Sequence, residues 1–231
     1  MSKQVVILAA GMGTRLARPL PKPLTELRDG RSIMKQQIDN LKFAFGETYR
    51  VMIVVGFKLE AIIERFPEAT FVYNELYDQT NTSKSLLKAL KASGDGGVLW
   101  LNGDVVFDPN VLNRVTPLIE ADQSFVVVNT SKVSDEEVKY TLGADGFIDQ
   151  LSKQVTPALG EAVGINFVAG VDKAALIGRL EEVSDQDYFE RGIEFGIQKD
   201  NLKFKAVDIS DLYAVEVDFA EDLERANELF S

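Results

Sequence analysis

The chain has 231 residues, of which 45% are hydrophobic and 26% are charged, a composition typical of a folded globular protein. Its formal net charge of −11 argues against a nucleic-acid-binding protein, which normally carries a basic face, and against a polybasic membrane attachment. The absence of cysteine and histidine excludes disulfides, thiolate or imidazole metal sites and a Ser-His-Asp triad. Any chemistry therefore depends on carboxylates, Lys, Arg, hydroxyl groups and a metal that prefers oxygen ligands.

Apolar runs alternate with amphipathic segments over the first half of the chain, which predicts a mostly parallel sheet in an α/β protein. Strands are predicted at residues 5–8, 50–55, 70–73 and 98–101. Helices are predicted from a Ser32 cap to Phe45, at 59–66 and at 83–92. No run approaches the length of a membrane span, and the apolar run at the start is too short for a signal peptide, so we expect a cytoplasmic protein without membrane insertion.

The second half of the chain is less regular. Strands are predicted at 125–129, 164–169, 202–207 and 214–217, with a hairpin formed by 138–142 and 147–151. Helices are predicted at 111–119, 174–183 and 188–198, and a final one runs from Asp218 to Leu229. No linker or repeat interrupts the sequence, so we expect a single domain over 1–231. Its mainly nucleotide-binding half would be 1–130, and its mainly acceptor-binding half 131–231.

The first strand leads directly into a glycine loop that carries cations. Gly11 and Gly13 follow the apolar run, and Arg15 and Lys22 come next, the lysine between two prolines. Glycine allows backbone N–H groups to approach an anion closely, and Arg and Lys supply compensating charge. The loop therefore predicts a phosphate site. Taken without the cations, the pair Gly11 and Gly13 could instead form an ordinary tight turn after the strand.

Two common phosphate loops do not fit this stretch. No Gly-Lys-Ser/Thr closes it, which excludes a Walker A loop, and Leu16 stands where the dinucleotide fingerprint requires its third glycine. The proline-rich continuation also disfavours a dehydrogenase, in which a long helix should begin at this point.

Two aspartates are the best candidates for holding a metal. Asp104 follows a buried strand, at the end where open α/β sheets bind ligands, and Gly103 before it lets a ligand approach. Asp218 ends the predicted strand A-V-E-V-D. Mg²⁺ is typically held by one or two carboxylates together with phosphate oxygens. The alternatives are an ordinary turn at Asn-Gly-Asp and a helix cap at Asp218.

The longer strings resemble the nucleotidyltransferases that make nucleoside-diphosphate sugars and CDP-alcohols. The resemblance rests on L-A-A-G-x-G-x-R-L with P-K-P-L (8–24), W-L-N-G-D-V-V-F (100–107), G-E-A-V-G-I (160–165) and V-E-V-D-F-A-E-D-L-E-R-A (215–226). These motifs span nearly the whole chain. The resemblance implies a Rossmann-like three-layer α/β fold with a mostly parallel, mixed central sheet.

The resemblance also implies roles for individual residues. A nucleoside triphosphate and a phosphorylated small-molecule acceptor would be the partners, and Mg²⁺ the cofactor. Asp104 and Asp218 would hold Mg²⁺, and Arg15 and Lys22 would be catalytic. The nucleotide would contact Leu8, Ala9, Ala10, Gly11, Gly13, Thr14, Arg15, Ser85 and Asp104. The acceptor would contact Lys153, Glu161, Asp187 and Tyr188.

The acceptor is expected to be phosphocholine or a related phospho-alcohol, and the nucleotide CTP. The segment 71–86 is similar to a region of CTP:phosphocholine cytidylyltransferases, and residues 185–190 combine aromatic rings with carboxylates, which suit a quaternary ammonium. The alternative for 185–190 is an ordinary helix start. The only tryptophan, Trp100, lies in the strand before Asp104 rather than in an aromatic cage for the acceptor, which departs from the choline pattern. The alternative for Lys153 is a solvated lysine of the hairpin, and the alternative for Glu161 is an ion pair with a surface cation.

Three further functions remain open at this stage. A sugar-1-phosphate nucleotidyltransferase using UTP, dTTP or CTP shares all the motifs. A molybdenum-cofactor nucleotidyltransferase shares the L-A-A-G-x-G-x-R start, although P-L-P-K-P-L and the C-terminal E-V-D are less typical of that group. A non-catalytic nucleotide sensor is a third alternative, against which the retention of Lys22, Asp104 and Asp218 argues.

Overall fold

A computed structural model describes residues 2–13, 16, 19–131, 133–134 and 137–229. The strands are β1 (Lys3–Ala9), β2 (Tyr49–Val55), β3 (Thr70–Tyr73), β4 (Val98–Asn102), β5 (Val105–Phe107), β6 (Phe125–Asn129), β7 (Lys139–Leu142), β8 (Ile148–Ser152), β9 (Gly160–Val168), β10 (Lys205–Asp208) and β11 (Ala214–Glu216). The helices are α1 (Ile33–Phe45), α2 (Leu59–Arg65), α3 (Thr82–Ala92), α4 (Asn110–Glu120), α5 (Lys173–Glu182), α6 (Phe189–Asp200) and α7 (Ala220–Glu228), with a 3₁₀ turn η2 (Lys22–Leu24).

The central sheet is mostly parallel, and its strand order creates the crevice that holds the site. The order is β10-β6-β9-β4-β1-β2-β3, and β9 runs antiparallel to its neighbours β4 and β6. From β1 the chain moves outward through β2 to β3, and it then returns to place β4 on the other side of β1. Ligands bind at such a reversal point, beyond the carboxyl ends of the strands. The loops after β1 and β4 therefore share one edge.

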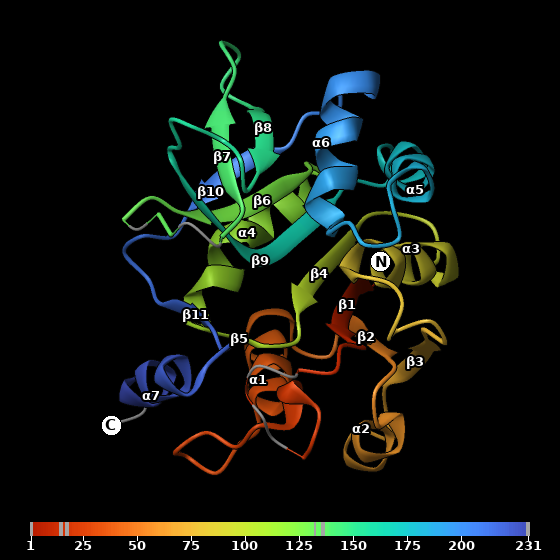
Figure 1. The fold of residues 1–231 in the computed structure, drawn as a ribbon, viewed down its shortest axis with the longest axis vertical. Helices are drawn as coiled ribbons and strands as arrows, with labels where there is room; N and C mark the ends of the chain where they lie inside the picture. Colours follow the sequence, from red (N-terminus) through yellow and green to blue (C-terminus); the bar gives the residue numbers. More distant parts are fainter. Residues whose placement is uncertain (1, 14–15, 17–18, 132, 135–136, 230–231) are drawn as a thin grey trace.

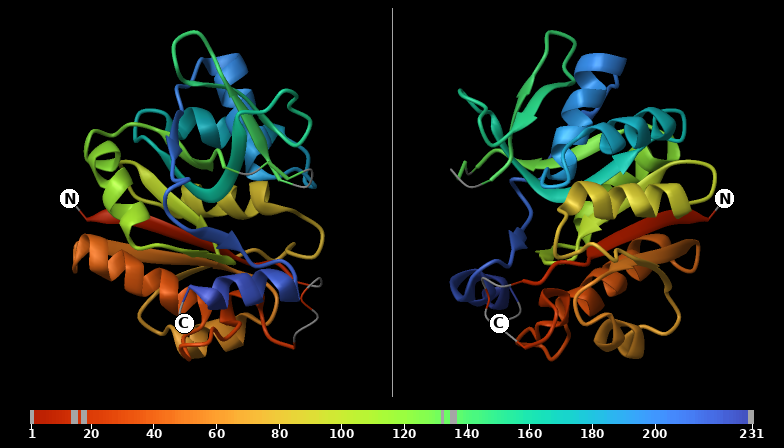
Figure 2. Two further views of the ribbon diagram at one scale, coloured as in Figure 1. Left: turned by 90° about the vertical axis from the view of Figure 1, so that its left-hand side faces the viewer. Right: turned by 45° about the vertical axis from the view of Figure 1, so that its right-hand side comes forward.

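Helices cover both faces of this sheet and produce the expected three layers (Figures 1 and 2). On one face α1, α2 and α4 bury side chains such as Leu41, Ile62 and Leu112 against the sheet. On the other face α3, α5 and α6 do the same with Leu86, Leu176 and residues around Ile193. None of the helices in the described part of the chain combines the length and apolar character needed to cross a bilayer.

The structure adds one element that the sequence patterns did not predict. The segment 105–107 forms the short strand β5, which pairs antiparallel with β11 in a separate two-stranded ribbon. A small apolar cluster that includes Leu27, Val106 and Leu223 joins this ribbon to α7 and to the start of α1. Figure 2 shows α7 lying beside the chain segments that surround α1. The ribbon thus brings the C-terminal part of the chain to the carboxyl end of β4.

Other boundaries moved by a few residues. β9 begins at Gly160 rather than at Gly164, so G-E-A-V-G-I is part of a strand, and β10 begins at Lys205 rather than at residue 202. The last helix begins at Ala220, and the side chain that accepts the Phe219 N–H is Asp222, at 2.8 Å. The predicted hairpin is confirmed as β7 and β8, with Gly146 at a φ of +80° in its turn.

Gly103, between β4 and β5, must remain small. A Cβ atom at this position would lie 2.6 Å from the carbonyl oxygen of Leu8 and 2.9 Å from Cγ of Pro23. We expect Gly103→Ala to lower the free energy of unfolding by about 1–3 kcal/mol, because neither contact can move freely. Gly178→Ala in the exposed part of α5 is the control, since nothing lies within 4 Å of its Cβ position. It should instead stabilise by roughly 0.5–1 kcal/mol in urea unfolding. Wild-type stability of Gly103→Ala would contradict this packing.

Candidate active site

The loop after β1 is fixed on both sides by backbone hydrogen bonds. The carbonyl of Leu8 accepts the Gly103 N–H at 2.9 Å, and the carbonyl of Ala10 accepts the Phe57 N–H at 3.0 Å. Ala9 is buried on the opposite face of the sheet from its two neighbours. The loop therefore leaves β1 between the ends of β2 and β4. The predicted contacts Thr14 and Arg15 lie outside the described residues.

Gly13 and Lys22 come together at the start of the site. Gly13 has a φ of +58°, which favours glycine, and a Cβ atom there would lie 3.1 Å from Cβ of Lys22. Lys22 opens the turn η2, and Pro21 and Pro23 restrict the backbone on both sides of it. The lysine is thus presented from a short, rigid turn beside the glycine loop.

The Lys22 ammonium bridges two aspartates from distant parts of the chain. Its Nζ lies 2.8 Å from Oδ2 of Asp104 and also donates a hydrogen bond to Oδ1 of Asp218. Burial by itself lowers the pKa of Lys22, but the charges and hydrogen bonds of the two aspartates outweigh burial and hold that pKa above its usual value. Lys22 therefore stays positively charged across the physiological range.

The pairing of β5 with β11 explains why the two aspartates meet. Val105 lies opposite Glu216 in this antiparallel ladder, and the Val217 N–H donates to the carbonyl of Asp104 at 2.9 Å. Extending the register by one more residue places Val217 opposite Asp104, and Asp218 follows directly. The sequence predicted both residues as a pair, and the structure brings them together.

Glu216 is a third carboxylate at this point, and the sequence interpretation did not assign it a role. Carboxylate oxygens of Asp104, Glu216 and Asp218 all lie within 4.8 Å of one another. Burial, followed by the negative charge of Asp104, raises the pKa of Glu216 well above its usual value. The signal was present in E-V-D: residues two apart in a strand point to the same side.

These three carboxylates could hold a divalent cation. They form an all-oxygen donor set, which suits a hard cation such as Mg²⁺, and each is half-buried and so accessible to a ligand. The ammonium of Lys22 already shows that a positive charge is favourable between Asp104 and Asp218. The residues present therefore fit the expected metal.

A cleft of about 320 Å³ begins at this cluster and extends toward β9. Asp218 and Glu216 line one side, and Glu161 from β9 lines it together with Ser134 and Glu137. Glu161 accepts the Ser134 N–H through Oε2 at 2.9 Å. The cleft connects the carboxylate cluster of Asp104, Glu216 and Asp218 to Glu161, one of the predicted acceptor residues. Glu161 is therefore not a remote surface side chain.

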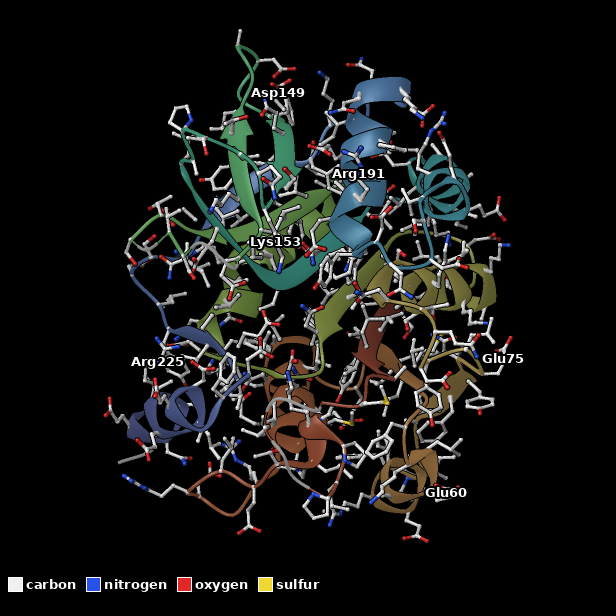
Figure 3. All side chains as sticks on the ribbon, viewed as in Figure 1. Glu60, Glu75, Asp149, Lys153, Arg191 and Arg225 are labelled. Carbon is white, nitrogen blue, oxygen red and sulfur yellow. The ribbon has the colours of Figure 1, made fainter. Side chains whose placement is uncertain are left out.

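Lys153 and Tyr188 lie together, although they are 35 positions apart in the sequence. The Lys153 Nζ lies 4.7 Å from the centre of the Tyr188 ring, which is a cation–π distance. Figure 3 shows Lys153 in front of β9, near the middle of the molecule. Glu190, the second residue of α6, is buried nearby, and burial raises the pKa of its carboxyl to about 7. Sequence reasoning named Glu190 in its aromatic and acidic cluster without giving it a role.

Two other predicted contacts have structural partners. The Ser85 Oγ accepts a hydrogen bond from Asn74 Nδ2 at 3.0 Å, beneath the first turns of α3. Oδ2 of Asp187 accepts the Ser184 N–H at 2.9 Å, in the turn before α6. Phe189 packs edge-on against Trp100 in the core, with ring centres 5.6 Å apart. In the cluster 185–190, Phe189 has the core role of the helix-start alternative. Asp187 does not cap α6, because the N-cap residue is Tyr188, which contacts Lys153.

The sequence of this chain is similar to those of several known proteins. The family model of the MobA-like NTP transferase domain matches residues 5–182. The CMP-5'-(3-aminopropyl)phosphonate synthase of Streptomyces rubellomurinus is 28% identical over 249 aligned positions, covering 99% of this chain and 39% of that protein. The bifunctional protein GlmU of Methanococcus maripaludis is 29% identical over 222 positions, covering 92% of this chain and 49% of that protein. The chain therefore spans less than half the length of these curated relatives.

Solved structures confirm the fold class. The inositol-1-phosphate CTP transferase from T. maritima superposes with a TM-score of 0.79 at 17% identity, covering 99% of this chain and 94% of the other. The CTP:phosphocholine cytidylyltransferase from Streptococcus pneumoniae superposes with a TM-score of 0.76 at 19% identity, covering both chains fully. The family model named above matches 178 residues (182 − 5 + 1), which is more than half of the 231-residue chain. The chain therefore belongs to the nucleotidyltransferase family of MobA-like NTP transferase domains.

Proposed function

We propose that this chain transfers a cytidylyl group from CTP to a small phosphorylated or phosphonate acceptor and releases pyrophosphate. The observation that carries the proposal is the cluster of Lys22, Asp104, Glu216 and Asp218 at the reversal point of the sheet. That arrangement supplies a fixed cation and an all-oxygen metal site beside a glycine loop. Cytidine is preferred because the curated relative from Streptomyces is a CMP-phosphonate synthase and covers the whole chain at 28% identity.

The chain's own residues account for binding and orientation. Backbone N–H groups of the loop from Ala10 to Gly13 face the triphosphate, as glycine loops do in other phosphate sites. Lys22, held in its turn by Pro21 and Pro23, contacts the phosphate that is transferred. Asp104, Asp218 and Glu216 would hold Mg²⁺, which would supply positive charge to the triphosphate. Arg15, in the position that the family motif gives it, adds a second cation.

The reaction needs no general base. An anionic oxygen of the acceptor's phosphate or phosphonate attacks the α-phosphorus of CTP and forms a new P–O bond. The bond from the α-phosphorus to the β-bridging oxygen breaks, and pyrophosphate leaves with that electron pair. The attacking oxygen is already deprotonated at neutral pH, so the absence of histidine from the sequence is compatible with this step. Fixed positive charge from Lys22 stabilises the developing negative charge.

The acceptor lies in the cleft between the metal-type cluster and β9. Lys153, beside the Tyr188 ring, would bind the acceptor's phosphate. The charge of Lys153 and that of Glu137, which lines the cleft, both act on the buried Glu190. Phosphocholine is the first acceptor to test, together with aminoalkyl phosphonates, because an aromatic ring beside a carboxylate binds ammonium groups. The Lys153 ammonium lies over this ring, so an ammonium acceptor would bind there only if the lysine moved toward the phosphate.

A sugar 1-phosphate is the second candidate acceptor. Glu161 lines the same cleft as Asp218, and a carboxylate there is suited to accept hydrogen bonds from sugar hydroxyls. A UDP-glucose pyrophosphorylase is among the solved structures with this fold, so a sugar 1-phosphate acceptor is compatible with the fold. It keeps the same metal site and the same chemistry, and it changes only the acceptor residues.

The proposal is tested by pyrophosphate release with CTP, UTP, GTP, ATP and dTTP. Each is combined with phosphocholine, 3-aminopropylphosphonate, inositol 1-phosphate and a panel of sugar 1-phosphates in the presence of Mg²⁺. We expect release with CTP and a phospho-alcohol or phosphonate, and a loss of at least 10³-fold in kcat in Asp104→Asn. Release with sugar 1-phosphates alone would shift the assignment to the second candidate. Release that Asp104→Asn leaves unchanged would contradict the site.

Removing the lysine should make the fold depend on metal. In Lys22→Met, the neighbouring carboxylates lose their compensating charge, and we expect the free energy of unfolding in EDTA to fall by about 1–3 kcal/mol. Mg²⁺ should restore more stability to this variant than it adds to the wild type. Lys35→Met is the control, because its i,i+4 ion pair with Asp39 is exposed and worth only about 0.5 kcal/mol. Equal effects of Mg²⁺ on Lys22→Met and wild type would show that Lys22 does not compensate a metal site.

The role of Lys153 separates acceptor binding from nucleotide binding. We expect Lys153→Met to raise the KM for the acceptor by about tenfold or more, with an unchanged KM for CTP, because a hydrogen bond to a charged group is worth about 1.5–3 kcal/mol. Lys203→Met, which removes an exposed ion pair with Asp145 at the hairpin, is the matched control. An unchanged acceptor KM in Lys153→Met, or an equal rise in both KM values, would remove Lys153 from the acceptor site.

A further inference from the structure

Helix α1 buries three amide side chains on a face that would ordinarily be apolar. Gln36, Gln37 and Asn40 are at most 5% exposed, and they lie among buried residues such as Ile33 and Leu41. Burying an amide costs free energy unless it forms hydrogen bonds. Each of these amides donates to a backbone carbonyl between residues 102 and 107. The side-chain nitrogens are therefore paired with the β4–β5 segment, whereas Oε1 of Gln36 and Oε1 of Gln37 have no hydrogen-bond partner among the described residues.

The acceptor carbonyls on β5 are those that its pairing with β11 leaves unused. In an antiparallel ladder, alternate residues direct their backbone groups toward the partner strand. Asp104 accepts from Val217, and the Asp108 N–H donates to Tyr213. The carbonyls of Val105 and Phe107 consequently point away from β11, and in the folded chain they face α1.

Gln37 makes a contact that differs from those of the other two amides. Its Nε2 donates to the carbonyl of Asn102 at 2.8 Å and to the carbonyl of Val105 at 2.8 Å. These two carbonyls stand directly before and directly after Gly103-Asp104. Gln36 and Asn40, in contrast, both donate to Phe107, three residues beyond Asp104. The fully buried side chain of Gln37 thus spans the turn that carries Asp104.

We infer that Gln37 is a positioning residue that sets the direction of the Asp104 carboxylate, an inference that rests on the proposed function. The Asp104 side chain must project toward Asp218 and Glu216 for the three carboxylates to act together. The turn that contains Asp104 forms no β-ladder on the side that faces α1 among the described residues. The two hydrogen bonds from Gln37 hold the turn against α1. Without them, the carbonyls of Asn102 and Val105 are left buried and unpaired, and the turn shifts to reach other donors.

The test compares two isosteric variants of neighbouring residues. Gln37→Met removes both bonds across the turn. Gln36→Met removes one bond to Phe107, whose carbonyl keeps its bond from Asn40 at 2.8 Å. Mn²⁺ alone is titrated into each protein, and free Mn²⁺ is followed by electron paramagnetic resonance. This readout requires no turnover and no nucleotide, and a general loss of stability does not by itself change it.

We expect the Kd for Mn²⁺ to rise about tenfold in Gln37→Met and by less than twofold in Gln36→Met. The kcat of Gln37→Met should fall in parallel, with little change in the KM for the acceptor. Equal Mn²⁺ affinities in both variants, whether weakened or unchanged, would overturn the positioning role. If Gln37→Met does not fold, Gln37→Asn is used, since its shorter amide cannot span both carbonyls, and a wild-type Kd in that variant would overturn the inference.

Asp104→Asn distinguishes failure of the inference from failure of the proposed function. We expect it to weaken Mn²⁺ binding more than Gln37→Met does. If Asp104→Asn binds Mn²⁺ as the wild type does, the proposed metal site is wrong and the inference falls with it. If Asp104→Asn loses Mn²⁺ and Gln37→Met does not, only the positioning role is overturned.

Discussion

The site depends on the compensation of negative charge between two strands of a short ribbon. Asp104, Glu216 and Asp218 approach within 4.8 Å of one another. At an effective dielectric constant near 20, each pair of full charges at such distances would repel by on the order of 3–4 kcal/mol. The ammonium of Lys22 offsets this repulsion, and burial, followed by the charge of Asp104, still raises the pKa of Glu216. The lysine turn, the ribbon and the glycine loop are therefore energetically linked.

The same constraint relates structure to chemistry. A cluster that holds a cation before substrate arrives is already arranged for the charge of a triphosphate and its metal, so little reorganisation is needed when they bind. The fold provides the rigidity for this arrangement. β1 and β4 fix the loops at the reversal point, α1 supports the β4–β5 turn through buried amides, and β11 delivers Asp218 from the end of the chain. The cluster joins segments that are 196 positions apart in sequence.

The sequence predicted the parts of the site whose signals are local. Gly13, Lys22, Asp104 and Asp218 each stand in a short motif, and the fold class follows from the alternation of strands and helices. Glu216 could also have been found, because it shares a strand face with Asp218. The ribbon could not, since β5 has only three residues and its pairing with β11 is decided by tertiary contacts. The amides of α1 were hidden for the opposite reason: a search for helical periodicity expects apolar side chains where Gln37 lies.

The acceptor side was harder to predict because its residues come from separate elements. The contact between Lys153 and Tyr188 joins the end of the β7–β8 hairpin to the start of α6, and the cluster 185–190 contains both core and site-facing side chains. Composition could not sort these roles. Only packing shows that Phe189 belongs to the core beside Trp100, whereas Tyr188 faces Lys153.

The proposed function requires the Lys22 ammonium to leave its place between Asp104 and Asp218 when metal and nucleotide bind. A crystal of the protein with Mn²⁺ and a non-hydrolysable CTP analogue, measured with X-rays near the manganese absorption edge, tests it directly. The account predicts an anomalous peak bonded to oxygens of Asp104 and Asp218, with the Lys22 ammonium moved from between them to a phosphate oxygen. A metal bound elsewhere, or a Lys22 that still bridges both aspartates with nucleotide present, would contradict it.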